Sequence, residues 1–248
     1  MSNLQKFFIT GFPRSGTTYL SVILNSQENI LCIESALESL NNLDIVKGNK
    51  YFNIVCSTFE NEFAAHGHKP PNFRSCNNIN DIKNLFYSEL KKIFNVEIVG
   101  MKNTRRSFSD VINLLKSGIK VIVVKRNPEE VILSNLNKFI NLTPIDVSIK
   151  LKAYNKNFNN YDLSNYKNIL VVDYSEMRYE IEKLFIKLSD FLQKDIYKPD
   201  KFYYSWNKNK GEFYNNSSFG LSGSNNLDNT RYKLKIKKYS NFVEGKNY

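Results

Sequence analysis

The chain alternates short apolar runs with longer amphipathic stretches, a pattern typical of α/β proteins. The short runs are rich in β-branched residues and end at charged or turn residues. Apolar strands of this kind are buried on both faces of a parallel sheet. We therefore expect a three-layer α/β domain with a central parallel β-sheet flanked by helices. The strands are expected at residues 6–10, 30–33, 96–101, 120–124 and 168–172.

Apolar residues at three- and four-residue spacing predict the helices between these strands. Leu20, Ile23 and Leu24 share one face of the first helix, and residues 79–81 are expected to cap another. Pro128 suits a helix start, because its fixed φ is already helical. The helices are expected at residues 17–25, 34–43, 51–65, 81–94, 107–117, 128–140, 144–158 and 176–192.

The last part of the chain differs from the rest. From Pro199 onward it is polar, rich in Asn, Ser and Gly, and no internal repeat precedes it. We expect residues 1–248 to form one domain, with residues 199–248 as a polar C-terminal segment that packs on the site or closes it.

Composition and charge narrow the function classes. The chain has 248 residues, 42% hydrophobic and 24% charged, which excludes a disordered or collagen-like protein. No apolar stretch approaches the roughly 18 residues of a membrane span. The N-terminus shows no signal-peptide pattern, so we expect a soluble, cytoplasmic protein. The net charge of +11 favours anionic partners, although the charge is spread along the chain.

Cysteine and histidine offer little for metal chemistry. The three cysteines, Cys32, Cys56 and Cys76, lie far apart, so we expect buried, reduced thiols. His66 and His68 stand close together, but no further ligand joins them, and we expect no metal site.

The strongest chemical signal is the loop from Gly11 to Gly16 between the first strand and first helix. Such a loop points backbone N–H groups and the positive end of the helix dipole at one place, which is a phosphate site. Its glycine spacing matches a nucleotide-binding P-loop, but Thr17 stands where that motif has the lysine that reaches the β- and γ-phosphates. Arg14, inside the loop, is the nearest cation.

This loop resembles that of a known family. Its residues are similar to the 5′-phosphosulfate-binding loop of sulfotransferases that use 3′-phosphoadenylyl sulfate, whose fold is P-loop-NTPase-like. The residues that carry the likeness, and that it implies bind the donor, are Pro13, Arg14, Ser15, Gly16, Thr17 and Thr18.

A second element supports the resemblance. Arg126 leaves a predicted strand, and Ser134 follows eight residues later in the next helix, as in the family's 3′-phosphate-binding element. A guanidinium and a hydroxyl placed in this way can donate to one anion. The resemblance implies transfer of a sulfuryl group to a hydroxyl or amine, with release of adenosine 3′,5′-bisphosphate and with no metal.

The resemblance also suggests catalytic residues. Lys102 occupies the place of a catalytic lysine that stabilises charge on the leaving oxygen, and Arg14 assists it. The histidine that cytosolic members carry two residues later is Thr104 here. A tyrosylprotein and glycan branch uses a glutamate, which predicts Glu34 as the base, with Glu38 next, although gap-free counting places it on Ser35.

The sequence outside these motifs leaves open which residues close the donor site and what the acceptor is. The likeness covers residues 1–40 and 100–192, and Arg231 and Ser222 are only candidates for closing the donor site. The acceptor is expected to be a small molecule, glycan or peptide with a hydroxyl, and no motif indicates specific nucleic-acid binding. The alternatives are a P-loop kinase with a degenerate loop, a non-enzymatic basic binding module, and a sulfotransferase fold without catalysis.

Overall fold

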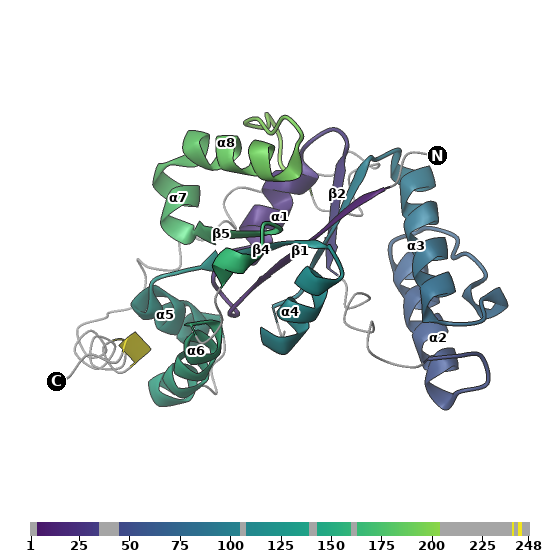
Figure 1. The fold of residues 1–248 in the computed structure, drawn as a ribbon, viewed down its shortest axis with the longest axis horizontal. Helices are drawn as coiled ribbons and strands as arrows, with labels where there is room; N and C mark the ends of the chain where they lie inside the picture. The colour runs from purple at the N-terminus through teal and green to yellow at the C-terminus, as the bar shows by residue number, and fades with distance from the viewer. Residues whose placement is uncertain are drawn as a thin grey trace.

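A computed structural model of the protein describes residues 4–34, 45–104, 108–138, 143–159, 163–203, 240 and 243–244. Within these residues, five parallel strands form one sheet in the order β2-β3-β1-β4-β5, with β1 at its centre (Figure 1). The strands are β1 (Gln5–Gly11), β2 (Ile30–Glu34), β3 (Ile98–Lys102), β4 (Lys120–Lys125) and β5 (Ile169–Asp173).

Helices cover both faces of this sheet, as the sequence predicts. Figure 1 shows α1, α7 and α8 on one side and α2, α3 and α4 on the other. Two short 3₁₀ turns, η2 (Phe73–Ser75) and η3 (Leu163–Asn165), lie between longer elements. The helices are α1 (Thr17–Asn25), α2 (Lys50–Ala65), α3 (Ile79–Phe94), α4 (Phe108–Lys116), α5 (Pro128–Lys138), α6 (Pro144–Asn159), α7 (Tyr174–Tyr179) and α8 (Ile181–Leu192).

The sheet separates two apolar cores because neighbouring side chains of a strand point to opposite faces. In β1, Phe7 and Ile9 pack with α1, α7 and α8, whereas Phe8 packs with α2, α3 and α4. In β3, Gly100 leaves the space that the Phe7 ring fills, since a Cβ there would lie 2.0 Å from that ring. β1, β2, β3 and β4 are thus mostly buried, whereas the edge strand β5 is partly exposed.

A third apolar cluster joins α5 and α6 to the loop after β1. Phe12 from this loop packs with Val131 and Leu151, and its ring meets the Tyr154 ring edge-on at 5.7 Å. Val243, near the C-terminal end of the chain, is buried in the same cluster. Val243 therefore belongs to the same apolar cluster as Phe12 of the loop after β1.

Strand order fixes where a ligand site can lie. From β1 the chain passes through α1 to β2 at one end of the sheet, whereas from the neighbouring β4 it passes through α5 and α6 to β5 at the other end (Figure 1). In open α/β sheets, neighbouring connections that diverge in this way leave a crevice at the carboxyl ends of the strands. The loops after β1 and β4 are those that carry the predicted phosphate-binding residues.

The structure corrects three local predictions. Glu34 ends β2 and does not begin a helix, and residues 35–43 lie outside the described part. Asn78 caps α3, because its side chain accepts from the backbone N–H of Asn80 and Asp81. The predicted helix 176–192 is two helices that meet at Glu180, whose φ of −132° and ψ of 42° are not helical. Periodicity does not reveal this break, because buried apolar positions continue in phase across it.

The three cysteines are buried and free, as expected. In the described ranges, no three His, Cys, Asp or Glu side chains are grouped to hold a metal ion. His68 instead packs edge-on against Phe94, with ring centroids 5.6 Å apart. None of the helices in the described part is both long and apolar enough to cross a membrane.

Candidate active site

The loop between β1 and α1 is a tight reversal of the backbone. Arg14 has a φ of 73° and Gly16 a φ of 102°, both left-handed, and the Ser15 N–H donates to the Phe12 carbonyl at 3.0 Å. The loop starts where β1 closely approaches β4, since a Cβ on Gly11 would lie 2.6 Å from the Val124 carbonyl oxygen. The chain therefore enters α1 directly from the carboxyl edge of the sheet.

The N-terminus of α1 is open to an anion. Its N-cap, Gly16, has no side chain that could accept from the first-turn N–H groups, and the first turn carries no acidic residue. The backbone donors of a first turn have no partners within the helix, and the helix dipole adds partial positive charge. Thr17 and Thr18 add hydroxyls to these donors, which together suit a phosphate or sulfate group.

Arg126 ties the loop after β4 to the loop after β1. Its Nη1 donates to the Arg14 carbonyl at 3.0 Å, and its Nε forms an ion pair with Glu130 at 2.7 Å. The guanidinium also lies over the Tyr174 ring, 4.0 Å from its centroid. With only 15% of its side chain exposed, Arg126 is fixed in place from three directions.

Two further contacts complete this cluster. The Arg14 Nε donates to the Ser134 Oγ at 3.2 Å, and the Asn135 side chain donates to the Pro13 carbonyl at 3.1 Å. Arg14, Arg126 and Ser134, predicted from separate parts of the sequence, thus lie together at one edge of the sheet.

Tyr174 supports both halves of the cluster. Besides stacking on Arg126, it packs so closely on Gly16 that a Cβ there would lie 2.5 Å from the ring and 3.0 Å from Met177. A glycine is therefore required at position 16 for two reasons: the backbone is left-handed there, and α7 packs too closely to leave room for a side chain.

Lys102 and Glu34 form a second cluster beside the first. They are register partners at the ends of β3 and β2, and Lys102 Nζ lies 3.0 Å from Glu34 Oε2. The same Nζ donates to Thr18 Oγ1 at 3.2 Å. The Lys102 side chain is only 6% exposed, whereas that of Glu34 is 76% exposed, so a buried cation holds a carboxylate that faces solvent.

Two other titratable groups lie near this pair. Burial raises the pKa of the Cys32 thiol to about 12, with Lys102 opposing and Glu34 adding to the rise. The thiol therefore stays protonated at neutral pH and is unsuited to nucleophilic chemistry. Burial, and secondly the Glu34 charge, raises the pKa of Glu62 on α2, which places another carboxyl within electrostatic reach of Glu34.

Sequence reasoning found part of this arrangement. It missed Glu130, Asn135 and Glu62, although Glu130 stands four residues after Arg126, a spacing at which helix side chains meet. Three candidates, Glu38, Ser222 and Arg231, lie outside the described residues.

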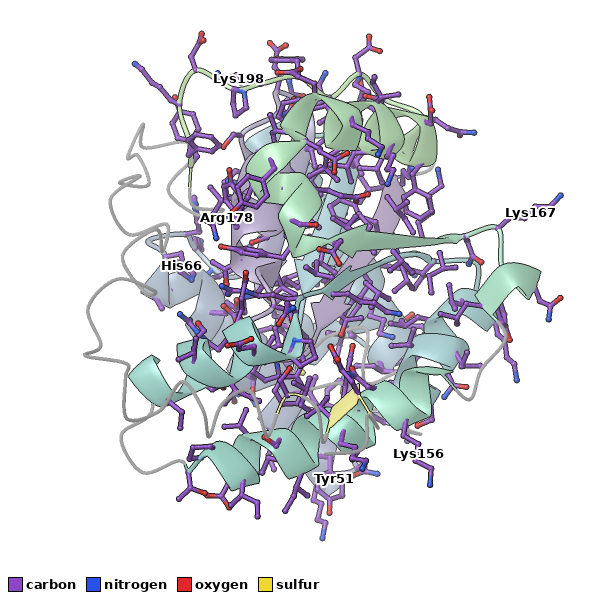
Figure 2. All side chains as sticks on the ribbon, turned by 90° about the vertical axis from the view of Figure 1, so that its left-hand side faces the viewer. Tyr51, His66, Lys156, Lys167, Arg178 and Lys198 are labelled. Carbon is purple, nitrogen blue, oxygen red and sulfur yellow. The ribbon has the colours of Figure 1, made fainter. Side chains whose placement is uncertain are left out.

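Three lysines elsewhere on the described surface extend in different directions. Figure 2 shows Lys156, Lys167 and Lys198 extending into solvent from α6, from the turn before β5 and from the segment after α8. These three lysines form no common patch of the kind that a non-enzymatic basic module would present.

Comparison with known proteins gives one family. The family model described as "Sulfotransferase domain" matches residues 4–229, which include the loop after β1, Lys102 and Arg126. No curated protein matches the chain.

Solved structures show related folds at low identity. The sulfotransferase domain of the Synechococcus PCC 7002 olefin synthase has a TM-score of 0.62 and 16% identity, covering 98% of this chain and 96% of that one. The sulfotransferase domain from the curacin biosynthetic pathway has a TM-score of 0.48 and 16% identity, covering 100% and 99%. Mouse sulfotransferase SULT7A1 complexed with PAP has a TM-score of 0.47 and 15% identity, covering 79% and 60%. The first of these likenesses supports the predicted fold.

Gly16→Ala tests the packing of α7 on the loop, with Gly48→Ala as the matched control. Gly48 has a φ of 94°, but a Cβ at this position would have no other atom within 4 Å, so its substitution reports left-handed strain alone. That strain costs about 1–2 kcal/mol. For Gly16→Ala we expect about 1–3 kcal/mol more, from the clash with Tyr174. Urea unfolding measures both, and equal losses of stability would contradict the close approach of Tyr174.

Proposed function

The chain belongs to the sulfotransferase domain family, and from this premise we propose that it transfers a sulfuryl group from 3′-phosphoadenylyl sulfate to an acceptor hydroxyl or amine. One observation carries the proposal: Arg14, Arg126 and Lys102 surround the open N-terminus of α1 at the carboxyl edge of the sheet. This donor set suits a ligand with several anionic groups and needs no metal to neutralise them.

The loop after β1 is assigned to the 5′-phosphosulfate. Its backbone N–H groups, the Arg14 guanidinium and the hydroxyls of Thr17 and Thr18 are the donors. Because Gly16 provides no cap of its own, these donors are available to the ligand. Pro13 and Ser15 shape the loop, and the bond from Asn135 to the Pro13 carbonyl holds it against α5.

Arg126 and Ser134 are assigned to the 3′-phosphate. Arg126 uses two of its five donors on Glu130 and the Arg14 carbonyl, so others remain for a ligand. Ser134 Oγ accepts from Arg14 and can still donate its own proton to a phosphate oxygen. The loop assigned to the 5′-phosphosulfate and the loop assigned to the 3′-phosphate are therefore already joined by the hydrogen bond from Arg126 to the Arg14 carbonyl.

Lys102 is assigned to the leaving oxygen. When bound, the donor supplies an activated sulfuryl group, and negative charge develops on the oxygen that leaves. An ammonium has three donors, and Lys102 uses two of them on Glu34 and Thr18. The third is available to stabilise the developing charge, and the low exposure of the side chain strengthens that interaction.

Glu34 is assigned as the general base. Its ion pair with Lys102 engages Oε2, so Oε1 is the oxygen that accepts the proton of the acceptor. The high exposure of its side chain gives an acceptor access to it. A hydroxyl loses its proton as it attacks, and a carboxylate in hydrogen-bond reach takes that proton.

The transfer itself is tested with the whole chain, 3′-phosphoadenylyl sulfate and three acceptor classes: a small phenol or alcohol, a glycan and a tyrosine peptide. We expect one class to gain the mass of a sulfuryl group, with adenosine 3′,5′-bisphosphate released in equal amount. ATP with magnesium replaces the donor in the control and should give no transfer. Binding of the bisphosphate without any transfer would indicate a sulfotransferase fold that has lost catalysis.

Arg126→Ala tests the 3′-phosphate assignment. Loss of charge-assisted bonds worth about 1.5–3 kcal/mol weakens the affinity for adenosine 3′,5′-bisphosphate by about 10- to 100-fold. Arg178→Ala is the matched control, because Arg178 is an exposed arginine on neighbouring α7 (Figure 2). Calorimetric titration measures both variants. An unchanged affinity in Arg126→Ala would remove the assignment.

Glu34→Gln and Lys102→Met separate catalysis from binding. Each is expected to lower turnover by about 100-fold or more, while the affinity for the bisphosphate changes little. The double variant should be no slower than the worse single variant, because the two residues act as one unit. A fully active Glu34→Gln enzyme would move the base to Glu62 or Glu38. Equal losses of turnover and affinity in Lys102→Met would make Lys102 a binding residue.

A further inference from the structure

The described C-terminal residues lie near the elements that hold the loop after β1. Figures 1 and 2 both show these residues, in yellow, beside α5 and α6. Val243 is only 6% exposed and shares an apolar cluster with Phe12, the residue that follows β1. Residues from near the two ends of the chain therefore pack in one cluster beside the loop that we assign to the 5′-phosphosulfate.

This cluster is small. Among the described residues it has six buried members, whereas the core on the side of α2 and α3 has 25. Besides Phe12 and Val243, its buried members come from α5 and α6. Apolar side chains are held by the neighbours that they contact, and a lost neighbour leaves a space that the others fill only in part. Loss of one member therefore removes a larger share of the packing here than in the large core.

Phe12 is the buried anchor of the loop. The loop also bonds α5 through polar groups, since Asn135 donates to the Pro13 carbonyl at 3.1 Å and Ser134 accepts from Arg14 at 3.2 Å. The bond between Arg14 and Ser134 is exposed to solvent, where water competes for both groups. The Phe12 side chain, by contrast, is only 9% exposed and reaches α5 and α6 through the cluster.

The position of Phe12 also affects the turn that follows it. The Phe12 carbonyl accepts from the Ser15 N–H at 3.0 Å, and the next residue, Gly16, is the N-cap of α1. A shift of Phe12 therefore moves the turn whose N–H groups are proposed to bind the anion. When only a fraction of the molecules holds the binding arrangement, the apparent affinity falls in proportion to that fraction.

From these contacts we propose that Val243 is a positioning residue of the donor site: it completes the cluster around Phe12 and so holds the loop after β1 in its anion-binding arrangement. This inference rests on the proposed function, because the ligand concerned is the 5′-phosphosulfate end of the donor. It gives Val243 a role in donor affinity and not in proton transfer, since Lys102 and Glu34 lie outside the cluster.

Val243→Ala tests this role in the whole chain, with Val96→Ala as the matched control. Val96 is 1% exposed and precedes β3, at the edge of the sheet opposite the loop. Both variants lose the same two methyl groups from a buried position, so both should unfold at a lower urea concentration. Only Val243→Ala should weaken the affinity for adenosine 3′,5′-bisphosphate, by about 3- to 10-fold in calorimetric titration. Equal affinities of the two variants would overturn the proposal.

Two further substitutions at position 243 examine the apolar packing itself. Val243→Ile keeps a β-branched apolar side chain and should retain the affinity of the unaltered protein. Val243→Asp places a carboxylate in the cluster, which is unfavourable without a partner, and should weaken the affinity about tenfold or more. A folded Val243→Asp protein that binds the bisphosphate as tightly as Val243→Ile would contradict the proposal.

Exchange of the Ser15 N–H separates failure of this proposal from failure of the proposed function, because it needs no ligand. In the free protein, NMR should show faster hydrogen exchange of this group in Val243→Ala than in Val96→Ala, since its bond to the Phe12 carbonyl opens more often. Equal exchange in the two variants would overturn the positioning role. Faster exchange in Val243→Ala, together with no binding of the bisphosphate by the unaltered protein, would support the positioning role and count against the proposed function.

Discussion

The hydrogen bond from Arg126 to the Arg14 carbonyl joins the two loops on which the candidate active site depends. Glu130 and Tyr174 hold the guanidinium in position, and Tyr174 also packs on Gly16 at the start of α1. A change in any one of these contacts alters both loops together. These contacts hold both loops in one arrangement, and such preorganisation lowers the entropic cost of binding a ligand.

The ion pair of Lys102 and Glu34 extends this arrangement along the sheet. Thr18 connects the pair to the first turn of α1, because it accepts from the same ammonium. Parallel strands in register bring the ends of β2 and β3 side by side, so a base candidate and a leaving-group candidate lie next to the loop after β1. The chemistry we propose follows from strand register as much as from residue type.

Local sequence signals were sufficient to predict the sheet, most helices and the glycine-containing turn between β1 and α1, because apolar periodicity and glycine spacing are short-range features. They identified Lys102 and Glu34 only as separate candidates, since the register between β2 and β3 is set by tertiary packing. The Tyr174 contacts and the break at Glu180 escaped prediction for the same reason.

The central claim is that the loop after β1 serves a sulfuryl donor and is not the nucleoside triphosphate site of a kinase. Competition calorimetry tests this most directly: the chain is titrated with adenosine 3′,5′-bisphosphate in the absence and presence of ATP with magnesium, at constant ionic strength. The account predicts that the bisphosphate binds and that ATP with magnesium does not displace it. Preferential binding of ATP with magnesium would contradict the account and favour a kinase with a degenerate loop.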